Sequence, residues 1–404
     1  MKSLPDGFLP NEAEILSFLK VIKDEPHDET HRLVFADWLE ERGDPRGTVM
    51  RFQCERDHTL ETLANRFESA KAEILSGAMT EWVSSATEWV DSWVCFRGLL
   101  AFHFRESVNF FEAIESFSEQ SWWPWTDALD FYGTGFDEDA LAQLSANKQF
   151  DSLNHLGLAS TRLTASGLGT LASTLSSHRL RSLDLNYNFF GDDGVKALAD
   201  NSPFENVEIL WLQQNSITAE GTEALVRSQC LSNLKDLDVG FNSIGPEGLA
   251  PLVKHFPFRE LYLNMCHIED EGAIAIARSE KLKDLAWLDV GNNDLSGEGL
   301  RVLVESPNLS RVRKLRARSN PFGNDGPKIL ADRAPENVRV LSLINTQITD
   351  EGVEVILKSD WFQQLEELDL RYNPISRGAN RRLKRRFNKT STKLLADPQS
   401  YPEG

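Results

Sequence analysis

The sequence has 404 residues with 62 acidic and 43 basic side chains, so its formal net charge is −19. A chain this acidic lacks the basic footprint that binds a phosphate backbone, and nucleic acid is therefore not expected as its main partner. Four dispersed cysteines argue against a disulfide framework, and no stretch approaches eighteen apolar residues, so we expect a soluble, cytoplasmic protein that does not contact a membrane.

Residues 1–60 are predicted to be helical. Asn11 and Glu14 have the spacing of a helix N-cap and its third residue. Pro26 is expected to end this first helix, a Gly-Asp-Pro stop at 43–45 to end a second, and a third helix to begin near residue 48. The apolar face of the first helix is formed by Ile15, Phe18, Leu19 and Ile22.

Within this helical segment, residues 25–47 read E-P-H-D-E-T-H-R-L-V-F-A-D-W-L-E-E-R-G-D-P-R-G. The string closely resembles the repeat-companion domain of planctomycete bacteria, defined by D-x-x-R-L-V-x-A-D-W-L-E-E-x-G-D-P, and departs from it at His31, where that family often has proline. The resemblance covers about residues 14–53 and implies a small helical module that precedes repeat arrays and has no assigned chemistry. Asp37 and Arg46 could belong to a binding surface, but we favour ion pairs on a solvated helix face.

Residues 61–95 are predicted to form a helical linker, with one helix over about 60–75 and a second segment, 79–93, that carries three tryptophans. Residues 96–125 are interpreted as a degenerate capping repeat, because Phe96, Leu99, Ala101 and Phe104 keep the spacing of the repeats that follow. The Trp-Trp-Pro-Trp cluster at residues 122–125 is either an aromatic ligand box or, as we favour, a plug for the exposed end of the core.

From residue 126 onward the chain contains ten copies of one sequence repeat, for example L-K-D-L-D-V-G-F-N-S-I-G-P-E-G at residues 234–248. We number the positions of each copy from 1. Positions 4 and 6 alternate as in a strand, an asparagine at position 9 follows where the chain turns, and an amphipathic helical stretch comes next. The copies begin at Thr126, Leu153, Leu180, Val207, Leu234, Phe258, Leu285, Val312, Val338 and Leu365, and candidate helix N-caps are Thr218, Gly245, Ser296, Gly323 and Thr349.

The L-x-x-L-x-L-x-x-N phrase and its period of about 27 residues are the signature of leucine-rich repeats, and the chain resembles the ribonuclease-inhibitor-like subclass of that family. An α/β solenoid is therefore expected over residues 96–393, a horseshoe with a concave parallel sheet, convex helices and a cap at each end. The basic run from Arg377 to Lys393 is either a patch for an acidic surface or, as we favour, the helix of the last repeat. Residues 394–404 are expected to form a tail.

Motifs for catalysis and cofactor binding are weak. His27 and His31 have H-x-x-x-H spacing, but Asp28 stands where a metalloprotease helix needs glutamate. Residues 133–138 resemble a dinucleotide-binding loop in which Glu138 replaces the third glycine. No serine or cysteine lies in a recognisable nucleophile motif. We therefore expect no catalytic residue, no cofactor, no metal site and no enzymatic activity.

The strand residues that face away from the core are expected to form the functional surface. They occupy positions 3, 5, 7 and 8 of each copy and combine aromatic rings with acids and two arginines. We expect a non-enzymatic scaffold that binds a basic or mixed-charge protein on this face. A GTPase-activating regulator and the substrate-recognition arm of a modifying enzyme remain alternatives. The candidate partner-binding residues are Tyr187, Trp211, Asp238, Phe241, Tyr262, Trp287, Asp289, Arg316 and Arg318.

Overall fold

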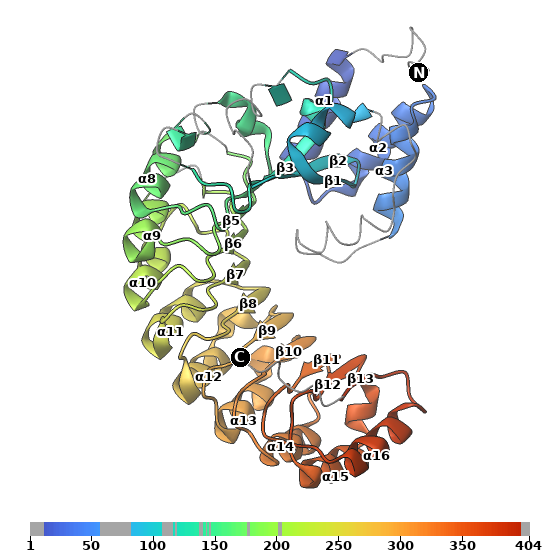
Figure 1. Ribbon diagram of the computed structural model, residues 1–404, viewed down its shortest axis with the longest axis vertical. Helices are drawn as coiled ribbons and strands as arrows, with labels where there is room; N and C mark the ends of the chain where they lie inside the picture. Colours follow the sequence, from blue (N-terminus) through green and yellow to red (C-terminus); the bar gives the residue numbers. More distant parts are fainter. Residues whose placement is uncertain are drawn as a thin grey trace. The chain divides into compact units, whose positions relative to one another are not determined.

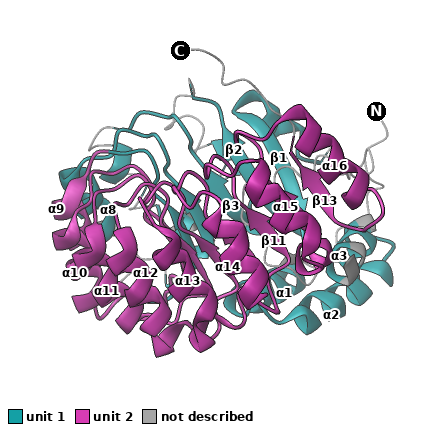
Figure 2. Ribbon diagram, turned by 90° about the horizontal axis from the view of Figure 1, so that it is seen from below, with its two compact units in different colours: residues 1–188, 202–206 teal, residues 189–201, 207–404 magenta. Residues whose placement is uncertain are grey.

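The structure, a computed structural model, describes residues 12–56, 82–106, 116–117, 119–136, 140–142, 144, 147–175, 178–200 and 204–396. These residues belong to two compact units (Figure 2): unit 1 comprises 1–188 with 202–206, and unit 2 comprises 189–201 with 207–404. The expected N-cap Asn11 and the helix expected over residues 60–75 lie outside the described ranges. Within those ranges, no helix is both long and apolar enough to cross a bilayer.

Unit 1 begins with three helices, α1 (Glu12–Asp24), α2 (Glu29–Glu40) and α3 (Pro45–Arg56), in the order that the sequence predicts. Asp28 caps α2, because its carboxylate accepts a hydrogen bond from the backbone N–H of Thr30 at 2.8 Å. The helix therefore starts after His27, which cannot share one helical turn with His31 as a metalloprotease motif requires.

Ion pairs cover the surface of these helices. Arg46 pairs with Asp44 at 2.5 Å, but these side chains are only 17% and 10% exposed, so this pair does not lie on the solvated helix face that we expected. Asp37, which is exposed, pairs with Arg51 of α3. Arg32 is buried and donates to the carbonyl oxygen of Pro26 at 2.8 Å. Asp37 and Arg46 thus have intramolecular partners, which agrees with a structural role.

The described residues 82–95 are not the helical linker that we expected from the tryptophan spacing. A short 3-10 helix, η1 (Ser84–Glu88), leads into strand β1 (Val90–Phe96). β1 pairs antiparallel with β2 (Leu99–Phe104), and the turn between them consists of Arg97 and Gly98, both with positive φ. Two such residues form the tight turn that a right-twisted hairpin needs, and this turn fixes an extended register.

The hairpin, rather than a full repeat, caps the first parallel strand of unit 1. β2 pairs parallel with β3 (Thr126–Asp130), which is the strand of the first copy. The strands of unit 1 then continue in chain order through β4 (His155–Gly157) to β5 (Ser182–Asp184), with helix α8 (Ala165–Thr174) between the last two. An antiparallel edge of this kind covers the core that the first parallel strand would otherwise expose.

The tryptophan cluster of unit 1 belongs to its core. Trp122 and Trp125 are 1% and 2% exposed, and the Trp125 ring stacks on Phe35 of α2 with 5.3 Å between centroids. Arg46 lies over the same ring at 4.3 Å, and the buried Lys23 of α1 donates to the carbonyl oxygen of Thr126 at 2.5 Å. The three helices therefore share a core with the first strands, and the boundary that we expected at residue 60 lies outside the described residues.

This shared core predicts that the first strands of unit 1 do not fold properly without the three helices. A chain that starts near residue 79 should be insoluble or lose its near-ultraviolet circular dichroism, because it exposes the apolar surface around Trp125. In the full chain, Phe35→Ala should lower the free energy of unfolding of unit 1 by about 3–5 kcal/mol. Val34→Ala, at a neighbouring residue that is 51% exposed, is the matched control and should change it little. A soluble truncated chain with an intact spectrum would show instead that the helices form a separate module.

Unit 2 consists of strand–helix repeats in which parallel strands lie on the inner side of a curve and helices lie on the outer side (Figure 1). The strands pair in chain order, and each strand residue lies opposite the residue at the same position of the next copy. The strands are β6 (Ile209–Trp211), β7 (Asp236–Asp238), β8 (Glu260–Tyr262), β9 (Trp287–Asp289), β10 (Lys314–Arg316), β11 (Val340–Ser342), β12 (Glu367–Asp369) and β13 (Lys393–Leu395). The helices are α9 (Gly191–Ala199), α10 (Ala219–Arg227), α11 (Gly245–His255), α12 (Glu269–Arg278), α13 (Gly297–Glu305), α14 (Asp325–Arg333), α15 (Asp350–Lys358) and α16 (Arg377–Phe387).

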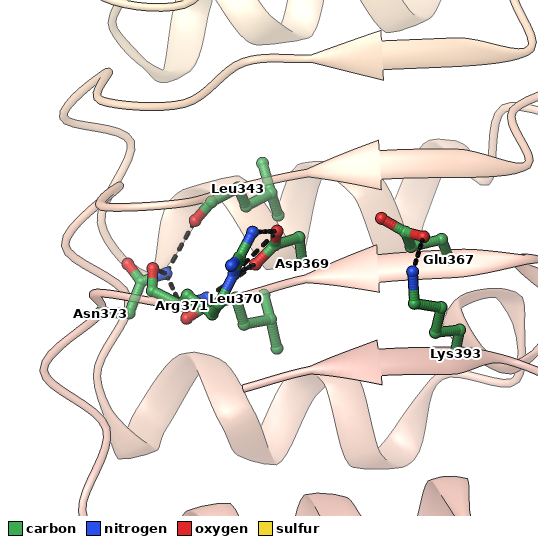
Figure 3. A network of polar contacts seen from close by, with 7 residues as sticks. All are labelled: Leu343, Glu367, Asp369, Leu370, Arg371, Asn373 and Lys393. Atoms are coloured by element: carbon green, nitrogen blue, oxygen red, sulfur yellow. Dashed lines mark hydrogen bonds and ion pairs between the residues drawn. The ribbon is translucent and has the colours of Figure 1, made fainter. Parts of the chain in front are cut away.

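The core of unit 2 confirms the register of the repeat. Leu234, Leu237 and Val239, at positions 1, 4 and 6, are 0% exposed. The buried asparagine at position 9 holds neighbouring copies together, as Figure 3 shows for Asn373, whose side-chain amide donates to the carbonyl oxygens of Leu343 and Leu370 at 2.7 and 3.0 Å. Such a ladder satisfies backbone groups that would be buried without partners at the end of each strand.

Three of the five expected N-caps are confirmed. Thr218, Ser296 and Thr349 each accept a hydrogen bond from a backbone N–H in the first turn of their helix. Gly245 and Gly323 are not caps: they have φ of 64° and 56°, and Gly245 is already the first residue of α11. At these two copies the turn after the strand needs a left-handed residue, which explains glycine there.

The last repeat closes unit 2 with the basic helix, as favoured. Leu383 and Phe387 of α16 are 0% and 2% exposed, so the apolar side of the helix covers the core. On its polar side Arg382 pairs with Glu354, and Arg386 pairs with Asp360 at 3.3 Å. The strand β13 extends to Leu395, so the expected tail from residue 394 begins later than predicted.

Candidate functional site

The inner strand face of unit 2 is built from positions 3 and 5 of each copy. Because the copies pair in register, residues at the same position form lateral rows across the sheet. The position 3 row runs Ile209, Asp236, Glu260, Trp287, Lys314 and Val340, and the position 5 row runs Trp211, Asp238, Tyr262, Asp289, Arg316 and Ser342. Neighbouring strands lie about 4.8 Å apart, so adjacent members of a row are in contact range.

The acids at position 5 accept hydrogen bonds from backbone N–H groups of their own copy. Asp238 accepts from the N–H of Gly240 at 2.8 Å, and Asp289 accepts from the N–H of Gly291 at 2.9 Å. Figure 3 shows the same arrangement at Asp369, which also binds the Arg371 guanidinium. These are Asx turns that end each strand. Asp238 and Asp289, which we predicted as partner-binding residues, therefore have a structural role.

The acids at position 3 lack this backbone role. Asp236 is 8% exposed, and its Oδ1 atom has no hydrogen-bond partner among the described residues. Its lateral neighbour Glu260 is half-buried and accepts a hydrogen bond from the Tyr262 hydroxyl at 2.7 Å. Burial and the negative charge of Glu260 raise the pKa of Asp236 to about 7, and burial also raises the pKa of Glu260.

An aromatic pair lies beside these acids. The rings of Tyr262 and Trp287 are both half-buried, and their centroids are 5.1 Å apart at an interplanar angle of 55°. The exposed side chains of Lys314 and Arg316 lie over Trp287, with Nζ at 4.1 Å and Cζ at 4.9 Å from the ring centroid. The face therefore changes from acidic on β7 and β8, through aromatic, to basic on β10.

Arg318 extends the basic end of the face. It lies at position 7 of its copy and is half-buried, and its side chain crosses the neighbouring Gly291. A Cβ on Gly291 would lie only 2.6 Å from Cγ of Arg318, so glycine makes room for this arginine. Arg316 and Arg318 also lower the pKa of Asp289, although burial has the larger, opposite effect.

Three predicted residues lie away from this cluster. Trp211 is 9% exposed, so its ring is largely covered, which corrects our expectation that it stands clear of the core. Phe241 and Tyr187, at position 8, are 37% and 39% exposed and have φ of 56° and 57°. The left-handed residue at position 8 turns the chain at the end of the strand, so these rings lie beyond the sheet; Tyr187 belongs to unit 1.

The structure thus brings together Tyr262, Trp287, Arg316 and Arg318 of the predicted set. It adds Asp236, Glu260 and Lys314, which sequence reasoning did not select. The sequence could have indicated these residues. An acid at position 5 is two residues before the turn and can bind a backbone N–H there, whereas an acid at position 3 is followed by strand residues, so its carboxylate does not bind the turn. The cluster of Asp236, Glu260, Tyr262, Trp287, Lys314, Arg316 and Arg318 is called the inner-face cluster from here on.

The buried acids make a prediction about pH. Burial raises the pKa of Asp236 and of Asp238 to about 7 from 3.8, so the folded state binds their protons more tightly than the unfolded chain does. Their contribution to stability is therefore complete below about pH 4 and is lost as the pH rises through 7. Asp236→Asn with Asp238→Asn should raise the free energy of unfolding at pH 8 by several kcal/mol and leave it nearly unchanged at pH 4, because each pKa rises from 3.8 to about 7.

Denaturant titrations at the two pH values would measure this difference. The matched control is Asp294→Asn, which removes the same charge from an exposed position. A gain at pH 8 that the control reproduces would be a general charge effect, and no gain at all would contradict the burial of the two acids.

The described residues offer little for catalysis. Burial raises the pKa of the Cys95 thiol to about 12 and raises that of Cys266, so neither thiol ionises near neutral pH. Ser182 and His155 share a hydrogen bond of 2.9 Å, but they are 8% and 2% exposed, so the hydroxyl is not open to a substrate. Glu25 and Asp28, between α1 and α2, come close to His31 in the first turn of α2, but Asp28 already caps that helix and His31 binds Glu25.

The family model of the leucine-rich repeat matches residues 176–199, 230–253 and 254–277. The matched segments are similar to leucine-rich repeats and cover less than half of the chain. They contain β5 of unit 1 and α9, β7, β8 and most of α11 and α12 of unit 2. The fold is an α/β leucine-rich repeat solenoid preceded by a helical segment. No curated protein is similar to this chain in sequence.

Several solved structures share similarity with the chain. An internalin, InlF, of Listeria monocytogenes is 19% identical over 70% of this chain and 84% of its own, with a TM-score of 0.39. A complex of TLR13 with ssRNA13 is 16% identical over 68% of this chain and 40% of that chain, with a TM-score of 0.42. The yeast Rad7–Elc1 complex is 16% identical over 100% of this chain and 97% of that chain, with a TM-score of 0.48.

Proposed function

We propose that this protein is a non-enzymatic scaffold that binds a partner protein through the inner strand face of unit 2. The observation that carries the proposal is the inner-face cluster, in which two acids, two aromatic rings and two cations lie on neighbouring strands β7–β10, and Arg318 follows shortly after β10. Exposed aromatic side chains next to arginine are typical anchors of protein interfaces. A rigid sheet presents them without a large loss of conformational entropy on binding.

The charges of the cluster favour a partner of mixed charge. Asp236 and Glu260 lie on one side of the aromatic pair, and Lys314 and Arg316 lie on the other. A purely basic partner, which the net charge of −19 favours, would meet repulsion at β10. A partner with a basic and an acidic group at matching separation would be attracted at both ends and held in one register.

Site-specific photocrosslinking tests this proposal. A photoreactive amino acid at Val340, a half-buried residue of the position 3 row, should capture a partner from a lysate of the source organism. The same amino acid at Glu271, exposed on α12 at the outer side, is the control and should not capture it. Capture from Glu271 alone would place the interface on the helices and contradict the proposal.

The finer assignments of the sequence remain proposals of the same kind. A complete α-helix in the described copies of unit 2 supports the ribonuclease-inhibitor-like subclass. Helix α2, which carries the A-D-W-L-E-E string, supports the repeat-companion domain of planctomycetes. A cytoplasmic location also stays a prediction.

A further inference from the structure

Asp236 is the least satisfied charged group of the inner face. It is 92% buried by area, and its Oδ1 atom has no hydrogen-bond partner in the described part of the chain. Its lateral neighbours are Ile209 on β6 and Glu260 on β8, and the negative charges of Glu260 and of Glu208, which precedes β6, raise its pKa further. Lys235 is close, but its ammonium group pairs with Glu208 at 2.6 Å. The backbone N–H of Glu260 and the charge of Arg259 lower the pKa of Asp236, but burial outweighs them. A buried carboxylate that is only partly satisfied destabilises the protein unless a cation pairs with it.

The same array shows how such an acid is satisfied elsewhere. Glu367, at the same position of a later copy, pairs with Lys393 of the next strand at 2.8 Å (Figure 3). For Glu260 the equivalent residue of the next strand is Trp287, which carries no charge. One Glu260 oxygen is held by the Tyr262 hydroxyl, and Arg259 is exposed and makes no described ion pair with Asp236. Arg259 lowers the pKa of Asp236 and Lys314 lowers that of Glu260, but within the described residues no cation forms an ion pair with either carboxylate as Lys393 does with Glu367.

We propose that Asp236 and Glu260 form a subsite for a basic side chain of the partner, a lysine or an arginine, with Tyr262 at its side. The proposal rests on the proposed function and adds the chemistry of one contact to it. An arginine or lysine places several N–H donors against the two carboxyl groups and its charge beside an aromatic ring. The neighbouring basic residues Lys314 and Arg316 remain available for an acid of the same partner.

Protonation should oppose this contact. The carboxyl of Asp236 holds a proton below about pH 7, because burial, Glu260 and Glu208 raise its pKa more than Arg259 and the backbone N–H of Glu260 lower it. A basic side chain binds the ionised form, so its affinity should rise between pH 6 and pH 8 as this proton is released. Burial raises the pKa of the Tyr262 hydroxyl, so this group stays protonated and does not contribute to the change.

The experiment uses small probes on the full chain, so it does not require the partner. The indole N–H resonance of Trp287, assigned with Trp287→Phe, is followed by NMR while N-acetyl-arginine methylamide or N-acetyl-lysine methylamide is added. N-acetyl-citrulline methylamide, which is neutral and nearly isosteric with the arginine probe, is the control ligand. We expect a saturable shift with a dissociation constant on the order of 10 mM for at least one basic probe, and none for citrulline.

The decisive variant is Asp236→Asn with Glu260→Gln, which keeps the shapes of both side chains. It should lose the saturable response while its circular dichroism stays unchanged, and Glu247→Gln with Glu271→Gln, at exposed sites on α11 and α12, should keep it. A response that survives in the first variant, or no saturable response to either basic probe, would overturn the subsite. Crosslinking from Val340 without a probe response would overturn the subsite alone, whereas crosslinking from Glu271 alone would overturn the proposed function.

Discussion

Leu237→Asp should lower the free energy of unfolding of unit 2 by more than about 3 kcal/mol, because it places an unpaired charge in the core. Leu237 is 0% exposed, and it lies between Leu210 and Leu261 of the two neighbouring strands. The core of a repeat array is continuous, so a break at β7 separates the copies before it from the copies after it. Denaturant titration followed by circular dichroism should show an earlier and broader transition.

The matched control for this variant is Val340→Asp. Val340 occupies position 3, one residue before the buried Leu341, and it faces the inner surface between Lys314 and Glu367. An aspartate there meets one cation and one acid in partial contact with water, so stability should change by less than about 0.5 kcal/mol. Equal losses in the two variants would contradict the alternation of core and surface positions on which the whole face is defined.

Asn242→Leu should lower the free energy of unfolding of unit 2 almost as much as Leu237→Asp does, although it replaces a polar residue with an apolar one of similar size. The Asn242 side chain accepts from the backbone N–H groups of Asn215 and Ile217, both at 2.9 Å. Its amide donates to the carbonyl oxygens of Leu212 and Val239 at 2.8 and 3.0 Å. Each buried backbone group left without a partner costs about 1–3 kcal/mol, so a total loss above about 3 kcal/mol is expected.

Asn233→Leu provides the comparison, because Asn233 is exposed. The two variants have the same change of composition, and only the ladder residue should lower the denaturant midpoint by a large amount. A small effect at Asn242 would mean that water or backbone rearrangement replaces its hydrogen bonds, and the ladder would then not be a main source of cohesion between copies.

The repeat made most of unit 2 predictable. A phrase that places leucine at positions 1, 4 and 6 and asparagine at position 9 fixes which residues are buried, and Leu234, Leu237, Val239 and Asn242 are buried as expected. The segment before the repeats was less predictable, because one copy of a pattern carries little information. The spacing of its tryptophans fits a helix, and the turn at Arg97 and Gly98 that fixes β1 as a strand is only two residues long.

The inner face was predictable as a surface but not in its chemistry. Sequence reasoning treated Asp238 and Asp289 as ligands for a partner, because it could not show that their carboxylates bind the N–H groups of Gly240 and Gly291. It also placed Trp211 in the open, although the ring is largely covered. Whether a side chain at the edge of a strand turns toward its own backbone depends on distances of a few ångströms, which periodicity does not encode.

The dissociation rate of the partner that crosslinking identifies, measured on purified variants without the photoreactive amino acid, tests whether the inner-face cluster binds that partner. Tyr262→Ala with Trp287→Ala should keep the fold and speed dissociation by the equivalent of about 2–4 kcal/mol, since aromatic anchors act mainly on residence time. Glu247→Ala with Glu271→Ala, on the outer helices, should leave the rate unchanged. A folded Tyr262→Ala, Trp287→Ala variant that releases the partner at the wild-type rate would contradict the account.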